Sequence, residues 1–404
     1  MKMPPARIVT LVLVDDAGTV LGTLPPFEAE TPWWMDIGPV VRAVRARHGL
    51  RVIVLRLLDT ERASAHGGAV SYLAQIDAGA TPPPLSPWHG ALPEDPKRHP
   101  YARIGGPQAD LAWAASALQA QGDVPAGEPE QIRTWNLSSI WRLPTRSGSA
   151  WLKVVPPFFA HEGRVLQALA GAPVPLLIGH EGGRLLLAHI AGEDCYEAPL
   201  TERLKMIDLL VALQRAWLGR CDELLALGLP DWRGPALTAS FAALVDQRAD
   251  ALQPDDRAPL AAFVSTLPTR FAALAACGIG DTLVHGDFHP GNVRGDGRTQ
   301  TLLDWGDCGI GHPLLDLPAF LDPTPEVERQ ATRAHWFAAW QRTLPGADLA
   351  RAVRLLGPLA LARKALIYQN FLDGIEAAEH PYHRSDVPDF LHRTADAVRV
   401  EAGA

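Results

Sequence analysis

The stretch from Leu283 to Phe320, LVHGDFHPGNVRGDGRTQTLLDWGDCGIGHPLLDLPAF, is the most informative part of this 404-residue chain. Two carboxylates and one amide stand in it at a distinctive spacing. Four residues separate Asp287 from Asn292, and Asp304 follows twelve residues after Asn292, within an Asp-Trp-Gly triplet. This is the spacing of residues that carry phosphoryl transfer: a base, followed by an amide and a carboxylate for magnesium.

The segment between Asn292 and Asp304 is predicted to form a tight hairpin. Gly295-Asp296-Gly297 supplies residue types that tolerate the positive φ of such turns. Val293-Arg294 and Thr299 to Leu303 can then pair as strands on either side. This hairpin would return Asp304 to the neighbourhood of Asn292, so that both side chains could reach one magnesium site.

Magnesium and a nucleoside triphosphate are the cofactors that this pattern indicates. Phosphoryl transfer requires positioning and charge neutralisation more than covalent chemistry from the protein. Mg²⁺ prefers oxygen ligands and takes one or two protein carboxylates together with substrate phosphates. The Asp304 carboxylate and the Asn292 amide oxygen would meet this need, while Asp287 would accept or orient the proton of an attacking hydroxyl. A lone Asp-Gly or His-Gly-Asp is only a turn signal, so the interpretation depends on the complete set.

The motif His285-Gly286-Asp287, followed by Asp304-Trp305-Gly306, resembles the aminoglycoside phosphotransferase and choline kinase family, in which HGD replaces the HRD of protein kinases. The continuation from Gly309 to Leu317 is similar to that family's G-x-x-x-x-D-L trailer, with Asp316 as a structural acid. The resemblance covers roughly residues 130 to 400. It implies a bilobal, protein kinase-like α+β fold, ATP or GTP with Mg²⁺, and a small-molecule hydroxyl as acceptor, whose identity it leaves open.

A kinase-like fold implies an upstream strand lysine that holds the nucleotide phosphates and a helix glutamate that holds the lysine. Lys153 is the candidate for the first, because apolar, β-prone residues flank it and Pro156-Pro157 ends the run. Glu162 opens the next helical pattern and is its candidate partner. The competing interpretation is an exposed strand lysine and a glutamate that only favours a helix start.

Two further nucleotide contacts follow from the resemblance. Residues 135–139, which include Ser138, stand where the loop over the phosphates belongs, although they lack the G-x-G-x-x-G of protein kinases. Leu185 to Gly192 has the pattern of a buried strand that runs into the family's hinge. The backbone of Ala188 to Ile190 would pair with adenine there.

Composition limits the remaining functions. The net charge of 37 − 45 = −8 gives no support for binding to nucleic acid or an anionic membrane. No run approaches about eighteen apolar residues, as a membrane span would require, and the amino terminus does not open as a secretory signal. The four cysteines are scattered without a C-x-x-C motif, which predicts reduced thiols in a cytoplasmic protein.

Residues 131–192 are predicted to form the amino-terminal lobe and residues 193–404 a helical carboxy-terminal lobe. Ala and Leu recur at helical spacing in 203–229 and 235–278. The late block 355–378 would help line the acceptor pocket if it acts as in relatives, although a solvated helix face is the commoner explanation for its charges. Its candidate residues are Arg363, Lys364, Tyr368, Gln369, Asp373 and Glu376.

Residues 1–120 are predicted to form a separate α/β domain, joined to the rest by a Pro- and Gly-bearing linker over 121–130. Hydrophobic patterning and turn residues give the order of its elements. The expected strands are Ile8 to Val14, Val20 to Leu24, Arg51 to Leu58 and Val70 to Ile76, the expected helix is Gly38 to His48, and a second helix is expected over Pro107 to Gln121.

This amino-terminal order resembles a Nudix-like sandwich, with Arg42 to Leu50 placed like the end of a Nudix box. That box reads R-E-x-x-E-E-x-G in the family, and here Ala43, Ala46 and Arg47 replace its acids. Without those carboxylates a magnesium cluster cannot form, so we expect no hydrolase activity. A scaffold, a ligand sensor or a dimerisation element that forms a homodimer are the remaining interpretations.

Taken together, the sequence predicts an ATP-dependent phosphotransferase of the aminoglycoside-kinase type behind a non-catalytic Nudix-like domain. One alternative is a metabolic kinase that acts on a sugar, an amino alcohol or a homoserine-type acceptor. Another is a nucleotide-binding regulator that no longer transfers phosphate. The joint presence of Lys153, Asp287, Asn292 and Asp304 argues against the regulator.

Overall fold

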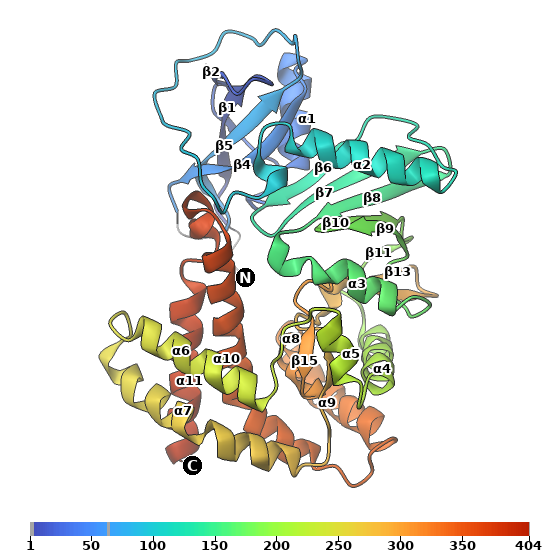
Figure 1. Ribbon diagram of the computed structural model, residues 1–404, viewed down its shortest axis with the longest axis vertical. Helices are drawn as coiled ribbons and strands as arrows, with labels where there is room; N and C mark the ends of the chain where they lie inside the picture. Colours follow the sequence, from blue (N-terminus) through green and yellow to red (C-terminus); the bar gives the residue numbers. More distant parts are fainter. Residues whose placement is uncertain (1–3, 63–64, 404) are drawn as a thin grey trace. The chain divides into compact units, whose positions relative to one another are not determined.

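The computed structural model describes residues 4–62 and 65–403 (Figure 1). Contacts between residues divide the chain into two compact units. Both units draw on segments that are far apart in the sequence. Unit 1 comprises Met1–Gly163, Leu177–His189 and Asn370–Ser385, and unit 2 comprises Arg164–Leu176, Ile190–Gln369 and Asp386–Ala404.

The first sheet of unit 1 is built from the amino-terminal strands in the order β2-β1-β5-β4, with β3 paired to β1. Strands β1 and β5 run parallel, and the other neighbours run antiparallel. Helix α1 ends at Gly49, whose φ of 64° is left-handed. The predicted elements of this region are therefore confirmed. Their bounds are β1 Arg7–Val14, β2 Val20–Thr23, β3 Phe27–Glu28, α1 Gly38–His48, β4 Val52–Thr60 and β5 Gly68–Ile76.

Strand β1 is buried on both faces because its apolar residues do not alternate with polar ones. Successive side chains of a strand point to opposite faces of the sheet. Leu11 and Leu13 pack in the larger cluster with Val40 and Val44 of α1, whereas Val12 packs in a second cluster on the other face. The amino-terminal sheet therefore carries a cluster of buried apolar residues on each face.

The second sheet of unit 1 has the order β6-β7-β8-β10-β9 and is antiparallel throughout. Helix α2 lies across one face (Figure 1), where Ala114 and Leu118 pack against Trp141, Leu152 and Leu186. The bounds are α2 Gly106–Ala120, β6 Glu130–Trp135, β7 Ser138–Thr145, β8 Gly148–Val154, α3 His161–Ala168, β9 Leu177–Glu181 and β10 Arg184–Ala188.

A buried side chain joins the two sheets of unit 1. The Gln131 amide accepts a hydrogen bond from the Val54 N–H at 2.9 Å and donates one to the Val54 carbonyl at 2.7 Å. Gln131 is 4% exposed, so these bonds replace contacts that water would otherwise make. The division into a domain over 1–120 and a linker over 121–130 stays a prediction, and the two sheets share one compact unit.

The late segment Asn370–Ser385 belongs to unit 1 by its contacts. Glu376 forms a buried ion pair with Arg98 at 2.9 Å and lies 3.7 Å from Arg56. Glu379 accepts a hydrogen bond from a backbone N–H of β4 at 2.8 Å. Burial raises the pKa of Glu379 to about 8. Buried polar contacts therefore tie this segment to the amino-terminal sheet.

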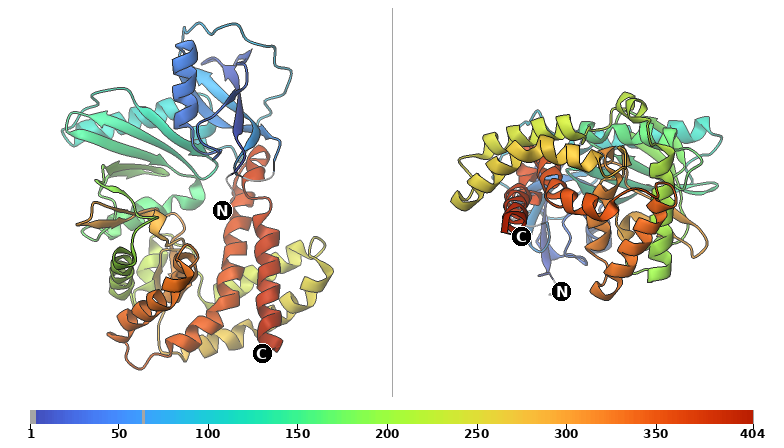
Figure 2. Two further views of the ribbon diagram at one scale, coloured as in Figure 1. Left: turned by 180° about the vertical axis from the view of Figure 1, so that it is seen from behind. Right: turned by 90° about the horizontal axis from the view of Figure 1, so that it is seen from below.

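Unit 2 is mainly helical, with two small sheets in the orders β11-β13-β14 and β12-β15. Helices α10 and α11 run side by side in both views (Figures 1 and 2), and Tyr368 stacks on Phe390 between them. The bounds are β11 Glu193–Asp194, α4 Leu200–Ala216, α5 Cys221–Ala226, α6 Gly234–Arg248, α7 Pro254–Ala275, β12 Thr282–Val284, β13 Val293–Gly295, β14 Gln300–Leu302, β15 Gly309–Gly311, α8 Leu317–Leu321, α9 Glu326–Gln341, α10 Leu349–Gly374 and α11 Asp386–Gly403.

Helix α7 is long and apolar enough, by length and composition, to cross a membrane, with a mean hydropathy of 1.2 over its most apolar window. Such a match is weak evidence, because core helices of soluble proteins share it. Its buried side chains include Leu260, Phe263 and Leu267, and Phe241 of α6 stacks edge-on against Phe263. The helix therefore contributes to the core of unit 2.

Candidate active site

The backbone of the His285-Gly286-Asp287 motif is held by a buried carboxylate. Asp316 accepts hydrogen bonds from the His285 N–H at 2.9 Å and the Gly286 N–H at 2.8 Å, and it is completely buried. Gly286 has a φ of 90°, and a Cβ there would meet the Asp307 carbonyl oxygen at 2.0 Å. The middle position of the motif therefore requires glycine. The role of structural acid expected for Asp316 fits these bonds.

The predicted hairpin is present, and it places Asp304 beside Asn292. Strands β13 and β14 pair antiparallel, and the Leu303 N–H donates to the Asn292 carbonyl at 2.7 Å. The His285 ring Nε2 donates to the Leu303 carbonyl at 2.8 Å. The backbone N–H and the carbonyl of Leu303 are thus both bound to residues 285–292, which we call the catalytic loop. Because Leu303 precedes Asp304, these bonds fix the position of Asp304 relative to that loop.

Asp287 is surrounded by three donors. Lys364 Nζ lies 3.0 Å from Oδ1, His289 Nε2 lies 3.5 Å from Oδ2, and the Asn292 amide donates to Oδ2 at 3.3 Å. The Asp287 side chain is one-third exposed, so a substrate can reach it. The structure thus supplies a carboxylate that is oriented by neighbours and open to solvent.

The charges around Asp287 keep it ionised. Burial raises the pKa of its carboxyl, but the Lys364 ammonium and His289 outweigh that effect and hold the pKa well below its usual range. Asp307 shows the opposite result, because burial and the nearby Asp287 charge raise its pKa to about 7. Two neighbouring carboxyls with separated pKa values are typical of sites that move protons.

Asn292 and Asp304 are the two oxygen donors predicted to bind magnesium. The Asn292 amide NH₂ donates to the Asp287 carbonyl at 2.8 Å, which leaves the amide oxygen to face away as a ligand. Asp304, with a φ of 59°, is the only non-glycine with positive φ among the described residues. Such strain at a carboxylate is typical of functional sites. These two oxygen donors therefore fit Mg²⁺, which takes few protein ligands.

Lys153 and Glu162 form an ion pair within unit 1. Lys153 Nζ lies 2.8 Å from Glu162 Oε1, and the two side chains are 13% and 2% exposed. Lys153 comes from β8, in register with Leu185 of β10, and Glu162 comes from the first turn of α3. This arrangement suits a lysine that is held ready for an anionic ligand, and the phosphate-binding role itself stays a prediction.

Residues 135–139, the predicted loop over the phosphates, contain a two-residue turn between β6 and β7. Ser138 is 6% exposed, and its hydroxyl accepts a hydrogen bond from the Trp135 indole at 3.1 Å. Asn136, in the turn, donates to the Glu379 carbonyl at 3.3 Å and lies 3.1 Å from the His383 ring. The Ser138 hydroxyl thus accepts one hydrogen bond and keeps its own O–H as a donor, and its contact with a phosphate stays a prediction.

The predicted hinge coincides with the point where the chain passes from unit 1 to unit 2. Ala188 ends β10, and the division between the units falls between His189 and Ile190. The Ile190 carbonyl accepts a hydrogen bond from Arg294 at 2.9 Å. This carbonyl is therefore engaged in unit 2, and the adenine contacts assigned to Ala188 and Ile190 stay predictions.

Two basic residues of α10 reach the catalytic loop, although no definite role was predicted for either from the sequence. Arg363 is buried and donates to the Gly286 carbonyl at 2.9 Å, and Lys364 pairs with Asp287. Sequence analysis named both only among six residues of a late helix. Asp307 was missed altogether, although its place three residues after Asp304 was an available signal.

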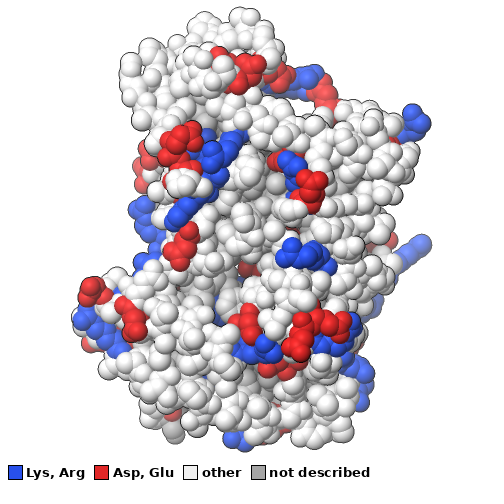
Figure 3. Space-filling model, viewed as in Figure 1, with Lys and Arg blue, Asp and Glu red and all other residues white. Residues whose placement is uncertain are grey.

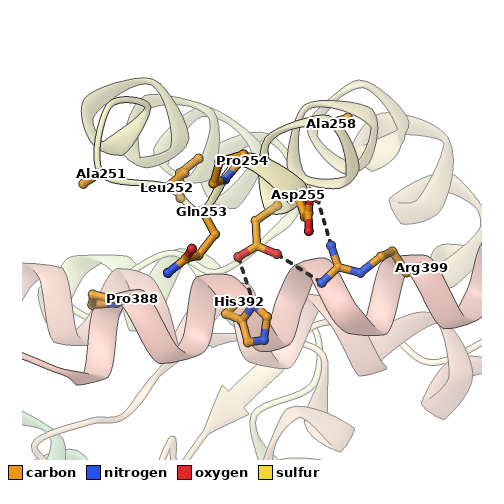
Figure 4. Close-up of a pocket in the computed structure, with 10 residues that line it drawn as sticks. Ala251, Leu252, Gln253, Pro254, Asp255, Ala258, Pro388, His392 and Arg399 are labelled. Carbon is orange, nitrogen blue, oxygen red and sulfur yellow. Dashed lines mark hydrogen bonds and ion pairs between the residues drawn. The ribbon is translucent and has the colours of Figure 1, made fainter.

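Two hollows lie elsewhere on the molecule. One, in unit 2, has a volume of about 800 Å³ and is lined by apolar and polar residues of the α6–α7 turn, the start of α7 and α11. The buried Asp256 carboxylate of this hollow is bonded to His392 and Arg399, at 2.9 and 3.0 Å. Figure 4 shows these two partners on one helix. The other, in unit 1, measures about 450 Å³ beside α1 and includes the pair Arg42–Glu30.

The surface shown in Figure 3 carries Lys and Arg intermixed with Asp and Glu. A continuous basic face would be needed to bind the phosphate backbone of a nucleic acid. The expectation from the net charge of −8 that the chain binds no nucleic acid stays a prediction. No group of three or more metal-ligating side chains occurs within residues 4–62 and 65–403.

Comparison with known proteins places these features in context. A sequence model described as "Phosphotransferase enzyme family" matches residues 131–356, more than half of the chain. No curated protein matches the chain. The Nudix-like relationship of the amino-terminal region stays a prediction, since the family match begins after it.

Several solved structures are similar to this chain at low sequence identity. A macrolide 2'-phosphotransferase from Brachybacterium faecium is 18% identical, the match covers 70% of this chain and 98% of that one, and the TM-score is 0.47. An ethanolamine kinase from Plasmodium vivax is 12% identical, with 67% and 81% of the two chains covered and a TM-score of 0.49. A choline/ethanolamine kinase family protein from Mesorhizobium loti is 15% identical, with 73% and 99% covered and a TM-score of 0.48.

Proposed function

Because the chain belongs to the phosphotransferase enzyme family and is thus a kinase with an alcohol group as acceptor, we propose that it transfers the γ-phosphate of ATP to a hydroxyl of a small molecule. The arrangement of Asp287, Asn292 and Asp304 is the observation that carries this proposal. A base, an amide oxygen and a strained carboxylate meet at one loop, held by Asp316 and by the β13–β14 hairpin.

Each residue has a role that its surroundings support. Asp287 accepts or orients the proton of the acceptor hydroxyl, because its carboxylate is ionised and partly exposed. Asn292 and Asp304 would hold Mg²⁺, which supplies charge neutralisation on the phosphates when it is bound. Lys153 would hold the nucleotide phosphates, and Glu162 would keep the lysine in place.

The test is the release of ADP from ATP by the purified chain with a mixture of hydroxylated metabolites and aminoglycosides. We expect turnover that needs Mg²⁺ and that Asp304→Asn abolishes, while the variant still melts cooperatively. Exchange of ATP for GTP would identify the donor. A wild-type chain that binds nucleotide but releases no ADP would instead support a regulator that does not transfer phosphate.

For the amino-terminal region we propose a Nudix-like domain without hydrolase activity, within a cytoplasmic enzyme that pairs into a homodimer through this region. The support is the face of α1, where Ala43, Ala46 and Arg47 stand in place of acids. The Asp287→Asn chain should hydrolyse no nucleoside diphosphate derivative with Mg²⁺ or Mn²⁺. Hydrolysis by that variant, or a monomeric mass by light scattering, would count against the respective part of this proposal.

A further inference from the structure

Lys364 is an unusual partner for a catalytic base because it comes from a late helix. Its ammonium lies 3.0 Å from Asp287 Oδ1, and its side chain is 21% exposed. The other carboxylate oxygen faces His289 and Asn292. A hydroxyl that donates to Asp287 must therefore approach a carboxylate that already has a cation on one oxygen.

The position of Lys364 is fixed by the residue before it. Arg363 is 1% exposed and donates from Nη2 to the Gly286 carbonyl at 2.9 Å. Two successive residues of α10 therefore contact two successive residues of the catalytic loop, one through the backbone and one through the carboxylate. This double contact holds α10 against the loop, so Lys364 is not a side chain that reaches the site by chance.

Charge around Asp287 limits the acceptors that can bind there. An acceptor hydroxyl within hydrogen-bond distance of Asp287 lies within about 4–6 Å of the Lys364 ammonium, a range over which like charges repel appreciably. A second ammonium next to that hydroxyl would repel Lys364 and compete with it for the same carboxylate. An uncharged or anionic neighbour of the hydroxyl would meet no such penalty.

We propose that Lys364 is a positioning and specificity residue, which orients Asp287 toward the acceptor hydroxyl and selects acceptors that carry no cationic group beside that hydroxyl. Sugars, polyols and sugar acids fit this description, whereas aminoglycosides and amino alcohols do not. This inference rests on the proposed phosphotransferase function, and it defines the acceptor class of the same site.

The experiment compares three acceptors with the same carbon skeleton and different charge: glucose, gluconate and glucosamine. Steady-state ADP release is measured for the full wild-type chain, Lys364→Met, Lys364→Arg and the control Arg354→Gln. Arg354 is an exposed basic residue of the same helix, so its variant removes an equal charge away from the site. Release of ADP with water alone as acceptor is measured in parallel.

We expect the wild-type chain to favour glucose or gluconate over glucosamine by at least about tenfold in kcat/KM. Lys364→Met should lower kcat by about ten- to a hundredfold, leave the KM for ATP within about twofold, and reduce the discrimination against glucosamine. Lys364→Arg should restore most of kcat, because it keeps the cation. Arg354→Gln should match the wild-type chain in every respect.

Several outcomes would overturn the inference. Preference for glucosamine by the wild-type chain would remove the specificity role. An unchanged kcat in Lys364→Met, or an equal loss in Lys364→Arg, would show that the lysine does not position Asp287 through its charge. If none of the three sugars is phosphorylated, the rate of ADP release with water as acceptor tests the role of Lys364. This rate should be lower for Lys364→Met than for the wild-type chain, as we also expect for Asp287→Asn. Absence of all ADP release by the wild-type chain would overturn the proposed function as well, whereas loss of the Lys364 effects alone leaves it standing.

Discussion

Lys153 and Lys364 are both lysines that pair with a carboxylate at nearly the same distance, 2.8 Å to Glu162 and 3.0 Å to Asp287. The first pair joins a strand to the next helix in unit 1, over nine residues of sequence. The second joins a loop to a helix of unit 2, over 77 residues. Because Lys153 and Glu162 are close in the sequence, the first pair could be predicted from it. The second pair forms only because α10 packs on the catalytic loop.

The two pairs also differ in which member is buried. Glu162 is 2% exposed and its lysine 13%, so the carboxylate serves the lysine. Asp287 is 34% exposed and its lysine 21%, so the carboxylate faces the substrate side. In each pair the more exposed member is the one that we propose to meet a ligand, Lys153 in the first and Asp287 in the second.

The largest expected effect comes from the carboxylate of the second pair. Asp287→Asn removes the base but keeps the size of the side chain, so kcat should fall by about 10²–10⁴. Binding of Mg-ATP, measured by calorimetry, should stay close to that of the wild-type chain. A near-normal kcat would show that Asp287 is not the base. The proposed difference in task between the Lys364–Asp287 and Lys153–Glu162 pairs would then be wrong.

The first pair should show a smaller and coupled effect. Lys153→Ala should lower kcat/KM for ATP by about 10²-fold, and Glu162→Ala less, because it acts only through the lysine. In the double variant, kcat/KM for ATP should be little lower than in Lys153→Ala alone. Effects that simply add would mean that the two residues do not act as a unit, even though they form an ion pair.

A third prediction concerns the pH dependence of the stability of unit 1. Glu379 has a pKa of about 8 in the folded chain and an ordinary value of 4.5, so its neutral form favours folding. This contribution is fully present below about pH 4.5 and is lost as the pH rises through about 8, at up to about 1.4 kcal/mol per pH unit. Thermal melting of unit 1 should therefore weaken between these limits.

Glu379→Gln should flatten this pH dependence, because the amide stays neutral throughout. Glu28→Gln serves as the control, since it removes an exposed acid of the same unit. Calorimetric melting at pH 6 and pH 9 gives the comparison. A Glu379→Gln chain with the same loss between these pH values as the wild-type chain would show that another group causes it.

The smallest effect is expected at the hollow of unit 2, where an exposed histidine meets a buried acid. The hydrogen bond that the His392 ring donates to the Asp256 carboxylate raises the pKa of His392. Its stabilisation is therefore present at pH values below the ordinary histidine pKa, and it is lost as the pH rises through the raised value. His392→Ala should lower the melting temperature by no more than about 2 °C at pH 6, because exposed pairs contribute little.

At pH 9 the same substitution should leave the melting temperature almost unchanged. Asp256→Asn should cost more at both pH values, since the buried carboxylate also binds Arg399. Equal effects of His392→Ala at the two pH values would mean that the histidine acts through packing and not through its charge.

Local pattern was sufficient to predict much of this fold. Gly295-Asp296-Gly297 determined the β13–β14 hairpin, and Gly49 ended α1 where the pattern stopped, since both depend only on backbone preferences of adjacent residues. The bond network at Ser138 was not predictable, because its partner Trp135 is oriented by residues from the 377–383 segment, including Tyr382. Packing of this kind depends on residues that no local window contains.

The sequence by itself predicted a phosphotransferase, and it predicted the hairpin that brings Asp304 close to Asn292. The roles of Asp287, Asn292 and Asp304 in phosphoryl transfer stay predictions. The sequence also identified Lys153 and Glu162, which one strand and the following helix bring together. Only the tertiary structure decided that Lys364 accompanies Asp287 and that Glu379 is buried in unit 1. Those contacts join segments distant in sequence, and their energy comes from burial and charge in the folded chain, which no local pattern encodes.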